Sequence, residues 1–230
     1  MGYNPPCVAQ RSASQDNYGV FVSLSIIDTY YWFNGLPSLK HRLLIAIDLP
    51  QDTKSELMRL QNDLAKFGVN ADWKSADKLI LELNYLGRID DSLISPIKKI
   101  TRNLTKDLGE LFLTPVYLQA LYSRHDPTEI FLTLNGDTDK LIDLQKQLCK
   151  EFRDIEIPQS KRYEPQITLG TLPRIDPTFT KQQIDKVDNF ELSSLSSFEV
   201  NALSLFELFV TKIGTHIQKV GAFMLESVQI

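Results

Sequence analysis

The sequence predicts an α+β fold of two similar halves, in which antiparallel sheets carry helices on their outer faces. Three observations lead to this prediction. Short apolar strand patterns are interleaved with amphipathic helix patterns, the mixture of strand and helix recurs in the second half, and the chain ends in a hairpin pattern. With 230 residues, the chain is long enough for one large domain or two tightly joined lobes.

The first half opens with a buried strand and a helix. Residues 42–48 (RLLIAID) form a nearly continuous apolar run, which is typical of a central strand covered on both faces. Leucines at helical spacing then predict a helix that ends near Gly68, and Thr53 with Glu56 has the spacing of a capping box at its start.

The elements that follow keep the same alternation. In the strand pattern at 78–86, one face is fully apolar and the other is mixed, and Gly87 is expected to close it. The further elements expected are a helix over 93–108, strands over 111–122 and 129–134, a helix over 141–152, a strand over 163–170, a helix over 178–189, and a closing hairpin of 198–211 and 217–225.

Composition and charge indicate an ordinary globular protein. The chain is 43% hydrophobic with a net charge of -4, which argues against binding to nucleic acid by bulk charge but leaves room for a local basic pocket. Cys7 and Cys149 form no disulfide framework and have no metal-ligand spacing, so a reducing cytoplasm is the expected compartment. Asp28 interrupts the most apolar stretch, 18–36, and no membrane association is expected.

Four segments carry a resemblance to a known family. Residues 42–50 (RLLIAIDLP), 71–87, 163–169 (YEPQITL) and 203–223 follow one another in an order and spacing that resemble LigT-like two-histidine (2H) phosphoesterases. These are RNA 2′,3′-cyclic phosphodiesterases, also called 2′-5′ RNA ligases. The resemblance implies two similar lobes around a central cleft, formed by residues 41–230, and leaves 1–40 as an N-terminal extension that we expect to be partly mobile.

In that family each lobe contributes one strand with a His-x-Thr or His-x-Ser motif. Residues two apart on a strand point to the same face, so each strand presents an imidazole and a hydroxyl together to the cleft. The two imidazoles serve as general base and general acid, and the hydroxyls donate hydrogen bonds to the phosphate.

The motif positions of this chain depart from the family pattern. In the first motif, the histidine position is Ile80 and the hydroxyl position is Glu82; in the second, they are Gln166 and Thr168. Only Thr168 keeps the family identity, and an arginine that often follows the second motif is Thr171 here.

These replacements weaken the expected chemistry. Ile80 cannot transfer protons, and Gln166 only donates and accepts hydrogen bonds. A general acid or base contributes about 10²- to 10⁴-fold to the rate, so the loss of both should leave little of the ordinary reaction. Glu82 could replace a base if burial raised its pKa, but its charge would also repel a phosphate.

Further candidate residues lie outside the motif positions. Lys161, Arg162 and Tyr163 precede the second motif strand, where they could hold a phosphate or stack a base at the rim of the cleft; the alternative is an ordinary solvated loop. The histidines of the chain lack the motif context, and packing or surface roles are expected for His41, His125 and His216.

The sequence therefore predicts a LigT-like protein that is catalytically impaired and binds a nucleotide, an RNA end or a protein partner in its cleft. The alternative is an active RNA 2′,3′-cyclic phosphodiesterase that uses non-standard residues. The resemblance implies no cofactor, and no metal-ligand spacing is present in the sequence.

Overall fold

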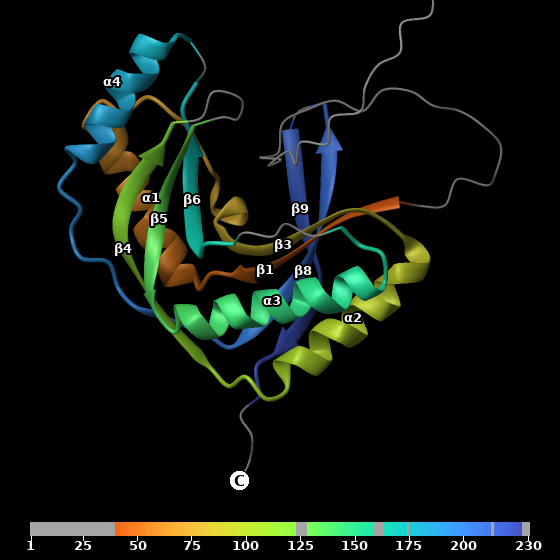
Figure 1. The fold of residues 1–230 in the computed structure, drawn as a ribbon. Helices are drawn as coiled ribbons and strands as arrows, with labels where there is room; N and C mark the ends of the chain where they lie inside the picture. Colours follow the sequence, from red (N-terminus) through yellow and green to blue (C-terminus); the bar gives the residue numbers. More distant parts are fainter. Residues whose placement is uncertain (1–39, 123–127, 159–162, 174, 213, 227–230) are drawn as a thin grey trace, which may run out of the picture.

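A computed structural model describes residues 40–122, 128–158, 163–173, 175–212 and 214–226 of the protein, and these form two antiparallel sheets flanked by helices (Figure 1). The predicted α+β class is confirmed. The first sheet has the strand order β3-β1-β8-β9, and the second has the order β2-β6-β5-β4-β7. The expected extension, residues 1–40, lies outside the described residues except for Lys40, where β1 begins.

The strands of the two sheets have the following bounds. Those of the first sheet are β1 (Lys40–Asp48), β3 (Ile80–Asp90), β8 (Ala202–Thr211) and β9 (Gly214–Met224). Those of the second sheet are β2 (Asp72–Trp73), β4 (Leu111–Leu121), β5 (Glu129–Gly136), β6 (Gln166–Thr171) and β7 (Phe198–Val200).

Four α-helices are present in the described residues: α1 (Gln51–Lys66), α2 (Asp91–Thr105), α3 (Thr138–Asp154) and α4 (Pro177–Asp188). A short 3₁₀ turn, η1 (Ala76–Lys78), precedes β3. Helices α2 and α3 lie side by side and both contact β3, while α4 packs near β4 at the far side of the second sheet (Figure 1). No helix in these parts of the chain has the length and apolar character needed to cross a membrane.

Strand β1 occupies the centre of the first sheet, between β3 and β8, and is buried on both faces. Leu43, Ile45 and Ile47 point into the main core, while Leu44 and Ala46 belong to a smaller apolar cluster on the other face. This explains why its sequence shows a continuous apolar run instead of a polar alternation. Each fully buried leucine or isoleucine contributes about 1.5–3 kcal/mol, so these side chains hold the strand firmly in place.

The start of α1 differs from the prediction. The helix begins at Gln51, directly after Pro50, and no side chain caps it. The expected capping box is wrong: Thr53 is buried within the helix, and the carboxylate of Glu56 accepts hydrogen bonds from the backbone N–H and the hydroxyl of Ser196. Because proline fixes φ and has no N–H to satisfy, Pro50 suits a helix start without a side-chain cap.

Two strand boundaries also differ. Strand β3 does not end at Gly87 but continues to Asp90, because a bulge at Leu86 of β3, opposite Leu43 and Leu44 of β1, accommodates the positive φ of this glycine. The segment expected as one strand over 198–211 is divided into β7 and β8, which pair in different sheets. The chain thus passes from one sheet to the other at Asn201.

Candidate functional site

The strands that carry both motif positions lie next to each other, since β3 of the first sheet contacts β6 of the second. On β3, Leu81 and Leu83 point into the main core, so Ile80 and Glu82 lie on the opposite face. On β6, Ile167 is the core residue, and Gln166 and Thr168 lie on the opposite face. We call the surface formed by these four motif positions and their neighbours the motif face.

Ile80, at the first histidine position, is 4% exposed and packs in the smaller apolar cluster. The other buried members of this cluster are Leu44, Ala46, Phe206 and Leu208. This part of the motif face is therefore dry and offers no group that donates, accepts or transfers a proton.

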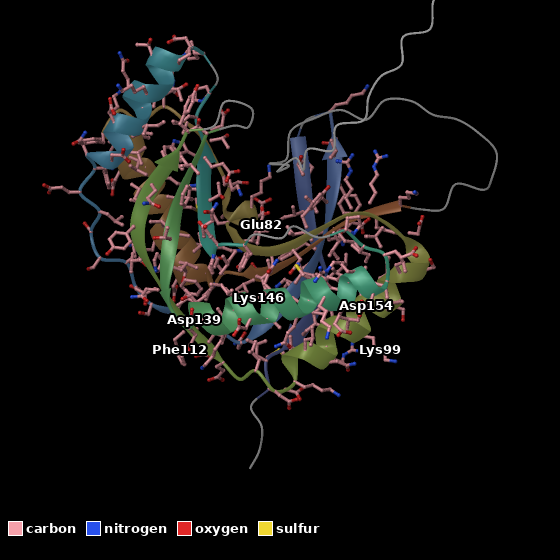
Figure 2. The ribbon with its side chains drawn as sticks, viewed as in Figure 1. Glu82, Lys99, Phe112, Asp139, Lys146 and Asp154 are labelled. Carbon is pink, nitrogen blue, oxygen red and sulfur yellow. The ribbon has the colours of Figure 1, made fainter. Side chains whose placement is uncertain are left out.

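Glu82, at the first hydroxyl position, faces Lys74 across the junction of the two sheets. The Nζ of Lys74 lies 3.8 Å from Oε1 of Glu82, and the two side chains are 25% and 47% exposed. Lys74 directly follows β2, whose Trp73 pairs with Gly170 of the second motif strand. Figure 2 shows Glu82 in the middle of the molecule, close to β6.

The second motif retains its threonine, but this residue already has a partner. The hydroxyl of Thr168 donates a hydrogen bond to Oε2 of Glu129, on the neighbouring strand β5, at 3.2 Å. Gln166 is half-buried, and its side chain makes no hydrogen bond within the described residues. On β6, the Thr168 hydroxyl is therefore already hydrogen-bonded, while the side-chain amide of Gln166 has no hydrogen bond within the described residues.

Tyr163 is placed differently from the expectation. Its ring packs against the main core, and its hydroxyl is buried without a hydrogen-bond partner among the described residues, so the ring is not a rim platform for stacking. Burial raises the pKa of the Tyr163 phenol, and the negative charge of Glu82 raises it further. Its predicted companions Lys161 and Arg162 lie outside the described residues.

A second buried hydroxyl lies beside the second motif. Thr133 of β5 pairs directly with Gln166, and residues opposite each other on antiparallel strands share a face. The Oγ1 of Thr133 is buried and has no hydrogen-bond partner in the described residues. Buried hydroxyls are almost always satisfied, so Thr133 and Tyr163 indicate an acceptor that these parts of the chain do not supply.

At the end of β1, the motif face continues into a charged cluster that sequence reasoning missed. Oδ1 of Asp48 lies 2.6 Å from Nζ of Lys54, and its other oxygen pairs with Lys219 of β9. Burial alone would raise the pKa of Asp48, but the hydrogen bonds from Lys219 and Lys54 outweigh it and lower the pKa. Both lysines thus form ion pairs with Asp48, a carboxylate of the protein itself.

The two described histidines and two hollows of the surface lie away from the motif positions. His41 points to the opposite face of the first sheet, where Nδ1 lies 2.7 Å from Oε1 of Glu207, and His216 is exposed on β9. His125 lies outside the described residues. Hollows of about 220 and 370 Å³ are lined by α1 with residues 190–195 and by α2 with α3, away from the motif strands.

Comparisons with known proteins agree with this architecture, although no family model matches the sequence. The chain is 24% identical over 147 residues to the RNA 2′,3′-cyclic phosphodiesterase of Thermotoga maritima, covering 64% of this chain and 78% of that protein. Its structure is similar to TT0787 of Thermus thermophilus, with a TM-score of 0.65, 16% identity and coverage of 82% and 100%. It is also similar to E. coli LigT complexed with 3′-AMP, with a TM-score of 0.63, 18% identity and coverage of 81% and 99%.

The two sheets and their adjoining motif strands define the fold of the LigT-like phosphoesterases. The sequence relationship to an RNA 2′,3′-cyclic phosphodiesterase, at 24% identity, agrees with this likeness of fold. The family resemblance predicted from the motif segments is thereby confirmed, while the roles of individual residues remain predictions.

Proposed function

We propose that this protein binds a phosphate-bearing nucleotide or RNA end on its motif face and is impaired in cleaving a cyclic phosphodiester. The observation that carries the proposal is a group of donors without acceptors around the second motif. The Lys74 ammonium, the Gln166 amide and the hydroxyls of Tyr163 and Thr133 make no hydrogen bond within the described residues.

An acceptor-rich ligand would satisfy such a group of donors. A phosphate has several strong acceptor oxygens, and charge-assisted hydrogen bonds from a lysine to a phosphate are about twice as strong as neutral ones. The related E. coli LigT has been seen with 3′-AMP, which carries such a group. Ile80 makes one part of the motif face apolar, but the unpaired groups beside β6 are polar and suit a phosphate better than an apolar protein surface.

The impairment follows from the two histidine positions. Ile80 is buried in an apolar cluster and Gln166 has no titratable group, so neither can serve as general acid or base. Because each such group contributes about 10²- to 10⁴-fold and the two act as a unit, we expect hydrolysis slower than that of a two-histidine relative by about 10²- to 10⁴-fold or more.

Two measurements test the proposal. The first is binding of 3′-AMP by isothermal titration calorimetry, for which we expect saturable binding that weakens with added salt. The second is hydrolysis of a 2′,3′-cyclic nucleotide by the natural chain and by the Ile80→His, Glu82→Thr, Gln166→His variant, for which we expect a gain of activity in the variant. Thermal melting of the variant must accompany this assay, because a histidine at Ile80 enters an apolar cluster.

Each outcome separates the candidates. If the natural chain hydrolyses the cyclic nucleotide at a rate typical of enzymes, it is an active phosphodiesterase. The candidate base is then Glu82, an accessible carboxylate at a motif position, and the Glu82→Gln variant should lose the activity. If neither 3′-AMP nor inorganic phosphate binds, the nucleotide proposal is wrong and the face is left to a protein partner.

A further inference from the structure

The three lysines of the motif face differ in how closely they contact a carboxylate, and one of them is available to a ligand. Lys54 and Lys219 both contact Asp48 closely. Lys74 stands 3.8 Å from Glu82, beyond hydrogen-bond reach, and its ammonium makes no hydrogen bond in the described part of the chain. An ammonium has three donors, so Lys74 keeps its donor capacity for another group.

The backbone of Lys74 is fixed against the second motif strand, which makes its position well defined. Its N–H donates to the carbonyl of Leu169 at 2.8 Å, and its own carbonyl accepts from Nε2 of Gln61 at 2.9 Å. The same amide nitrogen of Gln61 also donates to Leu169 at 2.9 Å, and Gln61 is 6% exposed. A buried side chain of α1 therefore ties Lys74 to the strand that carries Gln166 and Thr168.

We infer that Lys74 is the residue that contacts the ligand phosphate, and that Glu82 is a built-in counter-ion that the phosphate must displace. The inference rests on the proposed function and adds a named contact to it. Both side chains are partly exposed, so an anion can reach them, and the long separation leaves room for a phosphate oxygen to approach Nζ at about 2.7–2.9 Å.

The counter-ion sets the direction of the effects. A partly exposed ion pair is weak, so neutralising Glu82 releases Lys74 and removes one repulsive charge, and Glu82→Gln should tighten phosphate binding about 2- to 5-fold. Removing the ammonium discards a charge-assisted hydrogen bond, so Lys74→Met should weaken binding about 10-fold or more. In the Lys74→Met, Glu82→Gln double variant, the gain from Glu82→Gln should be reduced, because the released cation is absent.

The experiment is a calorimetric titration of the full chain and its variants with 3′-AMP and, separately, with inorganic phosphate at low ionic strength. The matched controls are Lys146→Met and Asp143→Asn, which remove a solvent-exposed ion pair of 2.8 Å on α3, a helix that carries none of the motif positions (Figure 2). Each control repeats the same charge change, so it reports the effect of net charge alone. Melting temperatures of all variants verify that they remain folded.

The results discriminate between this inference and the proposed function. The inference is supported if Lys74→Met weakens and Glu82→Gln strengthens binding of the probes, while both controls leave the affinity unchanged. If the natural chain binds 3′-AMP but Lys74→Met and Glu82→Gln behave like the controls, the inference is wrong and the proposed function stands. If no chain, including Glu82→Gln, binds either probe, both are overturned.

Discussion

The hydroxyl of Thr168 donates to Oε2 of Glu129 at 3.2 Å, so the one motif residue that keeps its family identity is bonded to a carboxylate. A ligand phosphate would have to take this donor from Glu129 and would meet a like charge beside it. Retention of the threonine in the sequence is therefore not equivalent to retention of its function. Glu82 occupies a motif position and Glu129 contacts another, and both carboxylates lower the attraction of the site for anions.

Replacing Glu129 with glutamine should strengthen anion binding. The change keeps the size of the side chain, removes the negative charge and weakens the hold on the Thr168 hydroxyl. We expect inorganic phosphate to bind about 2- to 5-fold more tightly, a range set by the modest strength of partly exposed charge interactions. Titration of Glu129→Gln beside the exposed control Asp143→Asn measures this, and equal affinities for the two would contradict it.

Tyr163→Phe should separate binding from stability. The phenolic hydroxyl is buried without a partner in the described residues, so its removal should leave the free energy of unfolding unchanged or raise it by up to about 1 kcal/mol. If the hydroxyl serves the ligand, the affinity for 3′-AMP should fall in the same variant. Urea unfolding and calorimetry together decide the matter, and a loss of stability of about 2 kcal/mol or more would indicate that the hydroxyl has a structural partner.

The carboxylate of Asp48 should make stability depend on pH in the acid range. Its pKa is lowered in the folded protein, because hydrogen bonds from Lys219 and Lys54 outweigh the effect of burial. A lowered folded-state pKa gives stability that is fully present above the unfolded value, near 3.8, and is lost as the pH falls through the folded value.

We therefore expect Asp48→Asn to lower the free energy of unfolding by about 1–2 kcal/mol at pH 7. The difference from the natural chain should shrink progressively as the pH falls below 3.8. Urea unfolding curves at pH 7 and at successive acid values test this. A difference that stayed constant over that range would show that the ion pairs of Asp48 do not stabilise the fold.

Alanine at Gly136 and Gly87 should have unequal costs. Both residues have positive φ, of 103° and 76°, which a side chain adopts at a cost of about 1–2 kcal/mol. A Cβ at Gly136 would also lie 2.2 Å from the carbonyl oxygen of Phe112, whereas one at Gly87 would meet nothing within 4 Å. Gly136→Ala should therefore destabilise the protein at least about twice as much as Gly87→Ala, as measured by urea unfolding. Equal losses would mean that the backbone near Phe112 relaxes freely.

Periodicity was sufficient to predict most of the fold. The apolar run of β1 and the alternation of β3 follow directly from which faces are buried, and the leucine spacing of α1 and α3 follows from their contact with the core. It failed at Thr53 and Glu56, where a capping pattern occurs within a helix that Pro50 starts. Glu56 instead serves Ser196, a residue distant in sequence that no local pattern can identify.

The sequence predicted the strands that carry the candidate site, but not the contacts of its side chains. Motif spacing placed Ile80, Glu82, Gln166 and Thr168 on two strands, and the structure brings those strands together. The pairing of Lys74 with Glu82 joins two different sheets and depends on a strand of two residues, which is too short to show a period. The partner of Thr168 likewise became visible only once β5 was placed beside β6.

The position of β1 in the first sheet has a consequence for biosynthesis. One edge of β1 pairs with β3, which follows soon after it, but the other pairs with β8, much later in the sequence. During translation the N-terminal segments are made first, so one edge of the apolar β1 has no partner until all five strands of the second sheet have been made. We therefore expect nascent or truncated chains that stop before Ala202 to be more prone to self-association through this unpaired edge than the whole chain.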